Sequence, residues 1–226
     1  MPADRSTKRR EALIALILVF LPNLVLTGLG LVVRGHAEQV AASQAAAHFG
    51  LSRLMRLAGL SAFMLLPTIV WLWRHRAGWK VLGWSREGLG RAAALGTLLG
   101  AAILRLRAQP FALDQLNKQA TWWALATYAV VALAEEMLYR GFLLRPLMAW
   151  LGRWWGYLAT ALLFMFLHLP ARVLGGEPLV ESLTYAAVQL LPMALFFGGV
   201  MLAANHVAAP TLVHLAWNWA SMLRRA

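Results

Sequence analysis

Long apolar runs separated by short polar segments account for most of the chain, and their lengths predict membrane-spanning helices. A helix needs about 20 apolar residues to cross a bilayer. We expect seven helices, near residues 12–33, 54–73, 89–106, 121–148, 154–172, 180–204 and 207–223. The Ala-rich segment 35–50 could supply an eighth. The pattern therefore predicts an all-α, polytopic membrane helix bundle that forms a single integral membrane domain over residues 1–226.

Composition agrees with a membrane protein and limits the possible partners. Hydrophobic residues make up 61% of the chain and charged residues 13%, whereas a soluble domain carries roughly 25% charged residues. The formal net charge is +12, but Lys and Arg lie at the ends of apolar runs, where they set topology and meet anionic lipid. We therefore expect the lipid bilayer, and no nucleic acid, as a partner. The absence of cysteine excludes disulfides, thiolate metal sites and a cysteine nucleophile.

Basic residues at the start of the chain predict its orientation. Arg5, Lys8, Arg9 and Arg10 precede the first apolar run, which is too long for a signal peptide and predicts a retained first helix with a cytoplasmic N-terminus. The strongly basic segment 74–91 is then cytoplasmic as well. Seven spans would place the two C-terminal arginines outside, a conflict that a re-entrant segment or an eighth span would resolve.

Two adjacent acids and an arginine interrupt the apolar run 121–148. Ionisable groups at membrane depth cost about 2.5 kcal/mol or more each and usually mark a functional site. Glu136 and Arg140 have the i, i+4 spacing, acid first, that allows an ion pair along one helix. Glu135 projects about 100° around the helix. It is therefore free to meet a partner from another helix and is our candidate general base.

Two further pairs of residues repeat this one-turn spacing on separate helices: Phe164 with His168, and His214 with Asn218. A neutral imidazole can accept a proton or bind a metal. Asn218 can donate to a developing oxyanion or orient His214 through a hydrogen bond. With Glu135, these side chains supply what hydrolysis of an amide bond by an activated water requires.

Each pair also has a purely structural interpretation. A buried Glu–Arg pair is commonly structural, a membrane histidine can serve packing, and a membrane asparagine joins helices with about 1 kcal/mol. On that interpretation the protein is a non-enzymatic scaffold, a bacteriocin-immunity factor or a transporter. Other protease classes fit less well, because no H-E-x-x-H motif is present and the aspartates Asp4 and Asp114 lie outside the expected helices. Three polar pairs on three helices favour a shared site.

The three motifs, in this order, resemble those of a known family. E-E-x-x-x-R at 135–140, F-x-x-x-H at 164–168 and H-x-x-x-N at 214–218 resemble the CPBP, or CAAX-protease and bacteriocin-processing, family of intramembrane proteases, to which the Ras-converting CAAX endopeptidase is related. The family core would cover roughly residues 85–223. The resemblance implies an intramembrane endopeptidase of the glutamic peptidase type, acting on a membrane-anchored protein or peptide.

The resemblance also implies a role for each residue. Catalysis would fall to Glu135 as the base with His168 as its partner, and to His214 and Asn218, which would hold the water or stabilise the oxyanion. Support would come from Glu136, Arg140 and Phe164. We expect no cofactor. The alternative is zinc bound by the Glu135, His168 and His214 side chains, with a water as fourth ligand.

The length of the chain bears on its substrate. It is shorter than the eukaryotic CAAX enzyme and resembles prokaryotic members, which are linked to peptide maturation, self-immunity to bacteriocins and cleavage of C-terminal sorting signals. We therefore expect a prokaryotic inner or plasma membrane protein whose substrate is a maturing peptide or a sorting signal, not a prenylated CAAX protein.

Overall fold

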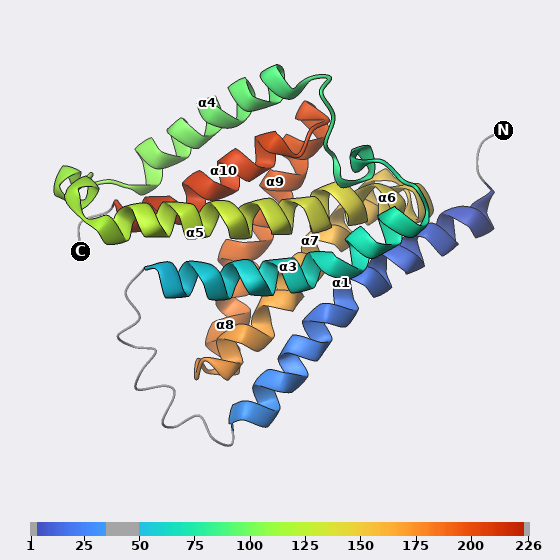
Figure 1. Cartoon of the computed structure of the whole chain (residues 1–226), viewed down its shortest axis with the longest axis horizontal. Coiled ribbons are helices and arrows are strands. Elements are labelled where there is room, and N and C mark those ends of the chain that lie inside the picture. Colours follow the sequence, from blue (N-terminus) through green and yellow to red (C-terminus); the bar gives the residue numbers. More distant parts are fainter. Residues whose placement is uncertain (1–3, 35–49, 224–226) are drawn as a thin grey trace.

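A bundle of α-helices makes up the structure, a computed structural model that describes residues 4–34 and 50–223 (Figure 1). No β-strand occurs in this part of the chain. The α-helices are α1 (Arg5–Arg34), α3 (Leu51–Arg74), α4 (Leu89–Arg107), α5 (Gln119–Glu136), α6 (Leu144–Leu151), α7 (Arg153–Leu174), α8 (Leu179–Tyr185), α9 (Leu191–Ala204) and α10 (Ala208–Trp219). Shorter turns are the 3-10 helices η1 (Trp79–Leu82), η2 (Leu113–Asn117) and η5 (Ala220–Met222), and the π-helical turns η3 (Met137–Leu143) and η4 (Ala186–Leu190).

The seven expected helices are all present. The fourth, expected at 121–148, is α5, η3 and α6 in direct succession, and the sixth, expected at 180–204, is α8, η4 and α9. Five helices of the described chain are long and apolar enough to cross a membrane: α1, α3, α4, α7 and the α8–α9 unit. These helices confirm an all-α membrane bundle. The eighth helix considered for segment 35–50 falls almost wholly outside the described residues.

The helices that carry the candidate site lie in the middle of the bundle. In Figure 1, α4, α10, α5 and α3 follow one another across the molecule, with α10 packed against α4 and α5, and α5 against α3. Helices α7 and α9 pack against each other, and α9 also packs against α10. The polar residues of α5, α7 and α10 can therefore converge inside the bundle.

Small residues let α4 and α10 approach closely. A Cβ added at Gly96 would lie 2.8 Å from the carbonyl oxygen of Ala209, and one at Gly100 would lie 3.3 Å from the Ala216 Cβ. Close backbone approach through glycine is a common way for membrane helices to pack, because van der Waals contact drives their association. This packing fixes the position of α10, which carries His214.

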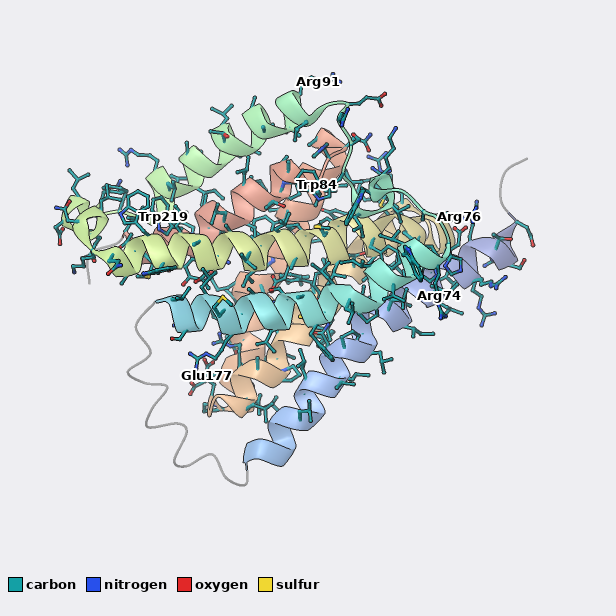
Figure 2. All side chains as sticks on the ribbon, in the orientation of Figure 1. Arg74, Arg76, Trp84, Arg91, Glu177 and Trp219 are labelled. Carbon is teal, nitrogen blue, oxygen red and sulfur yellow. The ribbon has the colours of Figure 1, made fainter. Side chains whose placement is uncertain are left out.

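The segment between α3 and α4 closes one end of the bundle. Figure 2 shows Arg74, Arg76 and Arg91 at this end. The segment is fastened to the α9–α10 junction, where Val207 N–H donates to the Gly83 carbonyl oxygen at 3.0 Å. These three arginines therefore lie at one end, as the positive-inside pattern expects, and the cytoplasmic assignment of this end stays a prediction.

Candidate active site

The helix that carries the two acids changes geometry directly after them. Helix α5 ends at Glu136 and continues as the π-helical turn η3, all seven residues of which are buried. Single π-helical turns inside α-helices occur frequently at functional sites. The π-helical turn packs tightly against η1, since a Cβ added at Gly141 would overlap the backbone of Leu82.

Glu136 and Arg140 form the expected ion pair. The Arg140 Nη1 atom donates to Glu136 Oε1 at 2.9 Å, and its Nη2 atom donates to the Ala194 carbonyl oxygen at 3.2 Å. Both side chains are almost fully buried, at 0% exposure for Glu136 and 2% for Arg140. The guanidinium carbon also lies 4.4 Å from the centroid of the Phe164 ring. Pairing and hydrogen bonding make these buried charges tolerable.

His214 lies between the two acids. Its Nδ1 atom is 2.9 Å from Glu136 Oε1, and its Nε2 atom is 3.8 Å from Glu135 Oε2. An ionised carboxylate can only accept, so Nδ1 carries a proton; in the neutral form of the ring, Nε2 is then an acceptor that faces Glu135. The sequence had suggested Asn218 as one residue that could orient His214; in the structure Glu136 makes the hydrogen bond to its Nδ1.

His168 approaches Glu135 from the other side. Its Nδ1 atom lies 2.7 Å from the Phe164 carbonyl oxygen, an acceptor, so Nδ1 again carries the proton. Its Nε2 atom lies 3.7 Å from Glu135 Oε1. Glu135 therefore meets both histidines, as expected for an acid free to find partners on other helices. The two distances exceed a direct hydrogen bond, and a polar contact of this length leaves room for a bridging water.

A cavity of about 480 Å³ joins these groups. It is lined by Leu57, Tyr128, Val131, Glu135, His168, Ala171, Arg172, Gly175, Glu177, Tyr185, Leu190, Met193, His214, Trp217 and Asn218. All four residues expected to be catalytic are among them. The three expected to be supporting are not among the lining residues: Glu136, Arg140 and Phe164 are buried.

Phe164 packs against both histidines. Its ring centroid lies 4.3 Å from that of His168 and 6.4 Å from that of His214, and it is fully buried. Phe197 of α9 also packs against His214, with the ring centroids 4.8 Å apart and the planes tilted by 36°, a contact that the sequence did not indicate. These rings restrict the rotamers of the two imidazoles and keep their Nε2 atoms directed at Glu135.

The cavity also contains polar residues that the motifs did not include. Arg172 lies in the last turn of α7, Glu177 follows in the connection to α8, and Tyr185 is the last residue of α8. Arg172 follows His168 by one helical turn, and this spacing alone could have revealed it. Tyr185 comes from the next helix, so no spacing within one helix could have signalled it.

The donor types for zinc are present, but their arrangement does not fit a metal ion. Within residues 4–34 and 50–223, no group of three or more His, Asp or Glu side chains is placed so that it could hold one. The Glu135 carboxylate oxygens lie 3.7 Å from His168 Nε2 and 3.8 Å from His214 Nε2. We therefore derive no chemical step through a metal, and the expectation of a cofactor-free site stays a prediction.

Comparison with known proteins agrees with the motifs. Residues 117–220 match the family model of type II CAAX prenyl endopeptidase, Rce1-like. The match covers somewhat less than half of the chain, and over these residues the chain is similar to that family, in agreement with the resemblance to the CPBP group of membrane proteases. The match runs from the last residue of η2 to the first of η5 and contains all seven residues that the motifs assigned to the site. It lies inside the expected core of 85–223, whose bounds stay a prediction. No curated protein and no solved structure matches the chain.

Proposed function

We propose that this protein is an intramembrane endopeptidase that hydrolyses a peptide bond of a membrane-associated peptide or protein with a water activated by Glu135. One observation carries the proposal. A carboxylate and two imidazoles whose Nδ1 protons are engaged elsewhere converge in one cavity, and with both rings neutral all three present acceptors. Three acceptors without a donor between them repel one another, and a water placed there would donate its two hydrogens to Glu135 and to one of the histidines.

The reaction can be written with the groups at hand. Glu135 takes a proton from the water, and the hydroxide oxygen bonds to the carbonyl carbon of the scissile peptide while the carbonyl electrons move onto its oxygen. Glu135 then returns the proton to the amide nitrogen, the oxyanion electrons re-form the carbonyl as the C–N bond breaks, and a carboxylic acid and an amine leave. The second hydrogen of the water is accepted by the Nε2 atom of either His168 or His214, which keeps the hydroxide in place.

The oxyanion needs a donor in the cavity. Asn218 lines the cavity, and its side-chain amide can donate a hydrogen bond. Neutral His168 and His214 cannot donate into the cavity, because their Nδ1–H groups are already directed at the Phe164 carbonyl oxygen and at Glu136. We assign oxyanion stabilisation to Asn218. Glu136 and Arg140 are positioning residues, since they act through the tautomer and orientation of His214.

The alternative is a scaffold, immunity factor or transporter that uses the polar cluster only for packing or binding. Glu135, His168 and His214 side chains far apart or facing lipid would have favoured it. They meet in one cavity instead, which supports the protease. A maturing peptide or a C-terminal sorting signal stays the predicted substrate.

Glu135→Gln tests the proposal, because it keeps the shape of the side chain and removes the base. The purified variant and wild type are reconstituted in vesicles with a mixed-sequence peptide library that carries an N-terminal acyl anchor, and products are read by mass spectrometry. We expect cleavage to fall by about 10²-fold or more. Glu181→Gln, an exposed acid of α8 outside the cavity, is the matched control. Unchanged cleavage in a folded Glu135→Gln protein would overturn the mechanism.

A further inference from the structure

We propose that Arg172 binds a carboxylate of the substrate at the edge of the cavity and thereby selects which peptides are cleaved. The inference rests on the proposed function. Arg172 lines the same cavity as Glu135 and His168. It follows His168 by four residues on α7, so the two side chains share one helical face.

The Arg172 guanidinium is only partly used by the protein. One terminal nitrogen pairs with Glu177, and the guanidinium carbon lies 3.6 Å from the centroid of the Tyr185 ring. The Nε atom is buried and has no hydrogen-bond partner. Arginine has five N–H donors in a planar fork that suits a carboxylate. A buried donor without a partner is costly, and an incoming carboxylate would remove that cost.

Glu177 holds Arg172 in place before a substrate binds. Its side chain is 43% exposed, whereas that of Arg172 is 26% exposed. It follows Gly175 and Gly176, and Gly176 has a φ of +96°, a conformation that glycine readily adopts. Figure 2 shows Glu177 where α7 passes into α8, away from Arg74 and Arg76. An exposed carboxylate on such a turn can give way to one from a substrate that also fills the cavity.

The spacing along α7 indicates where the substrate carboxylate lies. Four residues of α-helix rise about 6 Å, which equals about two residues of extended peptide. Arg172 therefore reaches a carboxylate about two residues from the bond that Glu135 and His168 address. This carboxylate is either the free C-terminus of the peptide or the side chain of an Asp or Glu, and the experiment separates these sources.

The test compares three pools of one mixed-sequence, N-acylated peptide library in vesicles. The first ends in a free carboxylate, the second in a carboxamide, and the third in a carboxamide with Asp or Glu fixed near the end. We expect Arg172→Gln to lower kcat/KM for the first pool about tenfold, mostly through KM, and to leave the second unchanged. Arg172→Lys keeps the charge without the fork and should lie between wild type and Arg172→Gln. Arg153→Gln, at the other end of α7 and outside this cavity, is the matched control.

Glu177→Gln supplies a second, independent variant. It removes the carboxylate that competes for Arg172, so we expect a lower KM, and hence a higher kcat/KM, for the favoured anionic pool. A preference of wild type for the third pool over the second, lost in Arg172→Gln, would assign the interaction to a side-chain carboxylate. Equal losses across all pools in Arg172→Gln, or no loss in any, would overturn the inference.

Binding separates this inference from the proposed function. Photo-crosslinking of the same pools to Glu135→Gln protein needs no turnover. In the double variant that combines Glu135→Gln with Arg172→Gln, we expect weaker capture of anionic peptides and unchanged capture of carboxamide peptides. Selective capture without any cleavage by wild type would leave the Arg172 assignment standing and refute the protease. Glu135-dependent cleavage that does not depend on Arg172 in any pool would support the protease and refute the Arg172 assignment.

Discussion

The Nδ1 atom of His214 lies 2.9 Å from Oε1 of Glu136, an acid that lies 78 residues earlier in the chain. The same oxygen accepts from Arg140 at 2.9 Å. One buried oxygen thus receives two N–H donors, from an arginine on its own helical segment and from a histidine on α10. This arrangement leaves the other nitrogen of His214 free to face Glu135 at 3.8 Å.

Replacing Glu136 should destabilise the fold as well as the site. Glu136→Gln leaves the Arg140 charge buried without a counter-ion, and breaking a buried pair in this way costs about 3–5 kcal/mol. We expect a lower midpoint of thermal unfolding in detergent, measured by circular dichroism. The matched control is Glu87→Gln, which removes an exposed pair with Lys80 at 3.8 Å and should change the midpoint little.

A double variant tests the pairing itself. Glu136→Gln combined with Arg140→Gln removes both charges, so the combined loss of stability should be smaller than the sum of the two single losses. Additive losses would show that Glu136 and Arg140 do not stabilise each other. The comparison uses the same unfolding assay and the same detergent.

Much of the fold could be predicted because apolar runs set the length and order of membrane helices. The π-helical turn at 137–143 could not, because it leaves no periodic signal in the sequence and its close packing at Gly141 is against Leu82, a residue 59 positions away. The Glu136–Arg140 pair could be predicted, because the two residues lie one helical turn apart and their contact follows from local spacing.

Contacts between helices set the limit of prediction for the site. Glu135 and Glu136 point in different directions around α5, and this suggested that they serve different partners. In the structure both contact His214, one at each ring nitrogen, because the ring lies between them. Such a contact depends on how α10 packs on α5, which no spacing along the chain reports.

Metal removal should leave the reaction unchanged. If the water is activated by Glu135 alone, purified protein treated with a strong chelator and then dialysed should cleave the acylated peptide library at the untreated rate. Elemental analysis of the same samples should find far less than one zinc per chain. Loss of cleavage on chelation, restored by zinc, would instead support the alternative set of Glu135, His168 and His214 as ligands.

Filling the contact at Gly141 should disturb the site from a distance. Gly141→Ala places a Cβ against the backbone of Leu82, which cannot move without shifting η1 or η3. Such overpacking typically costs about 1–3 kcal/mol, and the displaced η3 should also reduce peptide cleavage. Gly90→Ala in α4 has open space around its Cβ and should keep or slightly raise stability. Equal unfolding midpoints for the two variants would contradict the packing argument.

Orientation in the membrane can be tested cleanly because the chain has no cysteine. Lys80→Cys places a thiol in the segment between α3 and α4, and Asp114→Cys places one in the segment between α4 and α5. Helix α4 separates the two positions, and the positive-inside rule puts the basic Lys80 segment in the cytoplasm. In intact cells, a membrane-impermeant maleimide should therefore label Asp114→Cys at once and Lys80→Cys only after the membrane is opened. The opposite order of labelling would reverse the assignment, and it would also move the Glu177 end of the cavity to the cytoplasmic side.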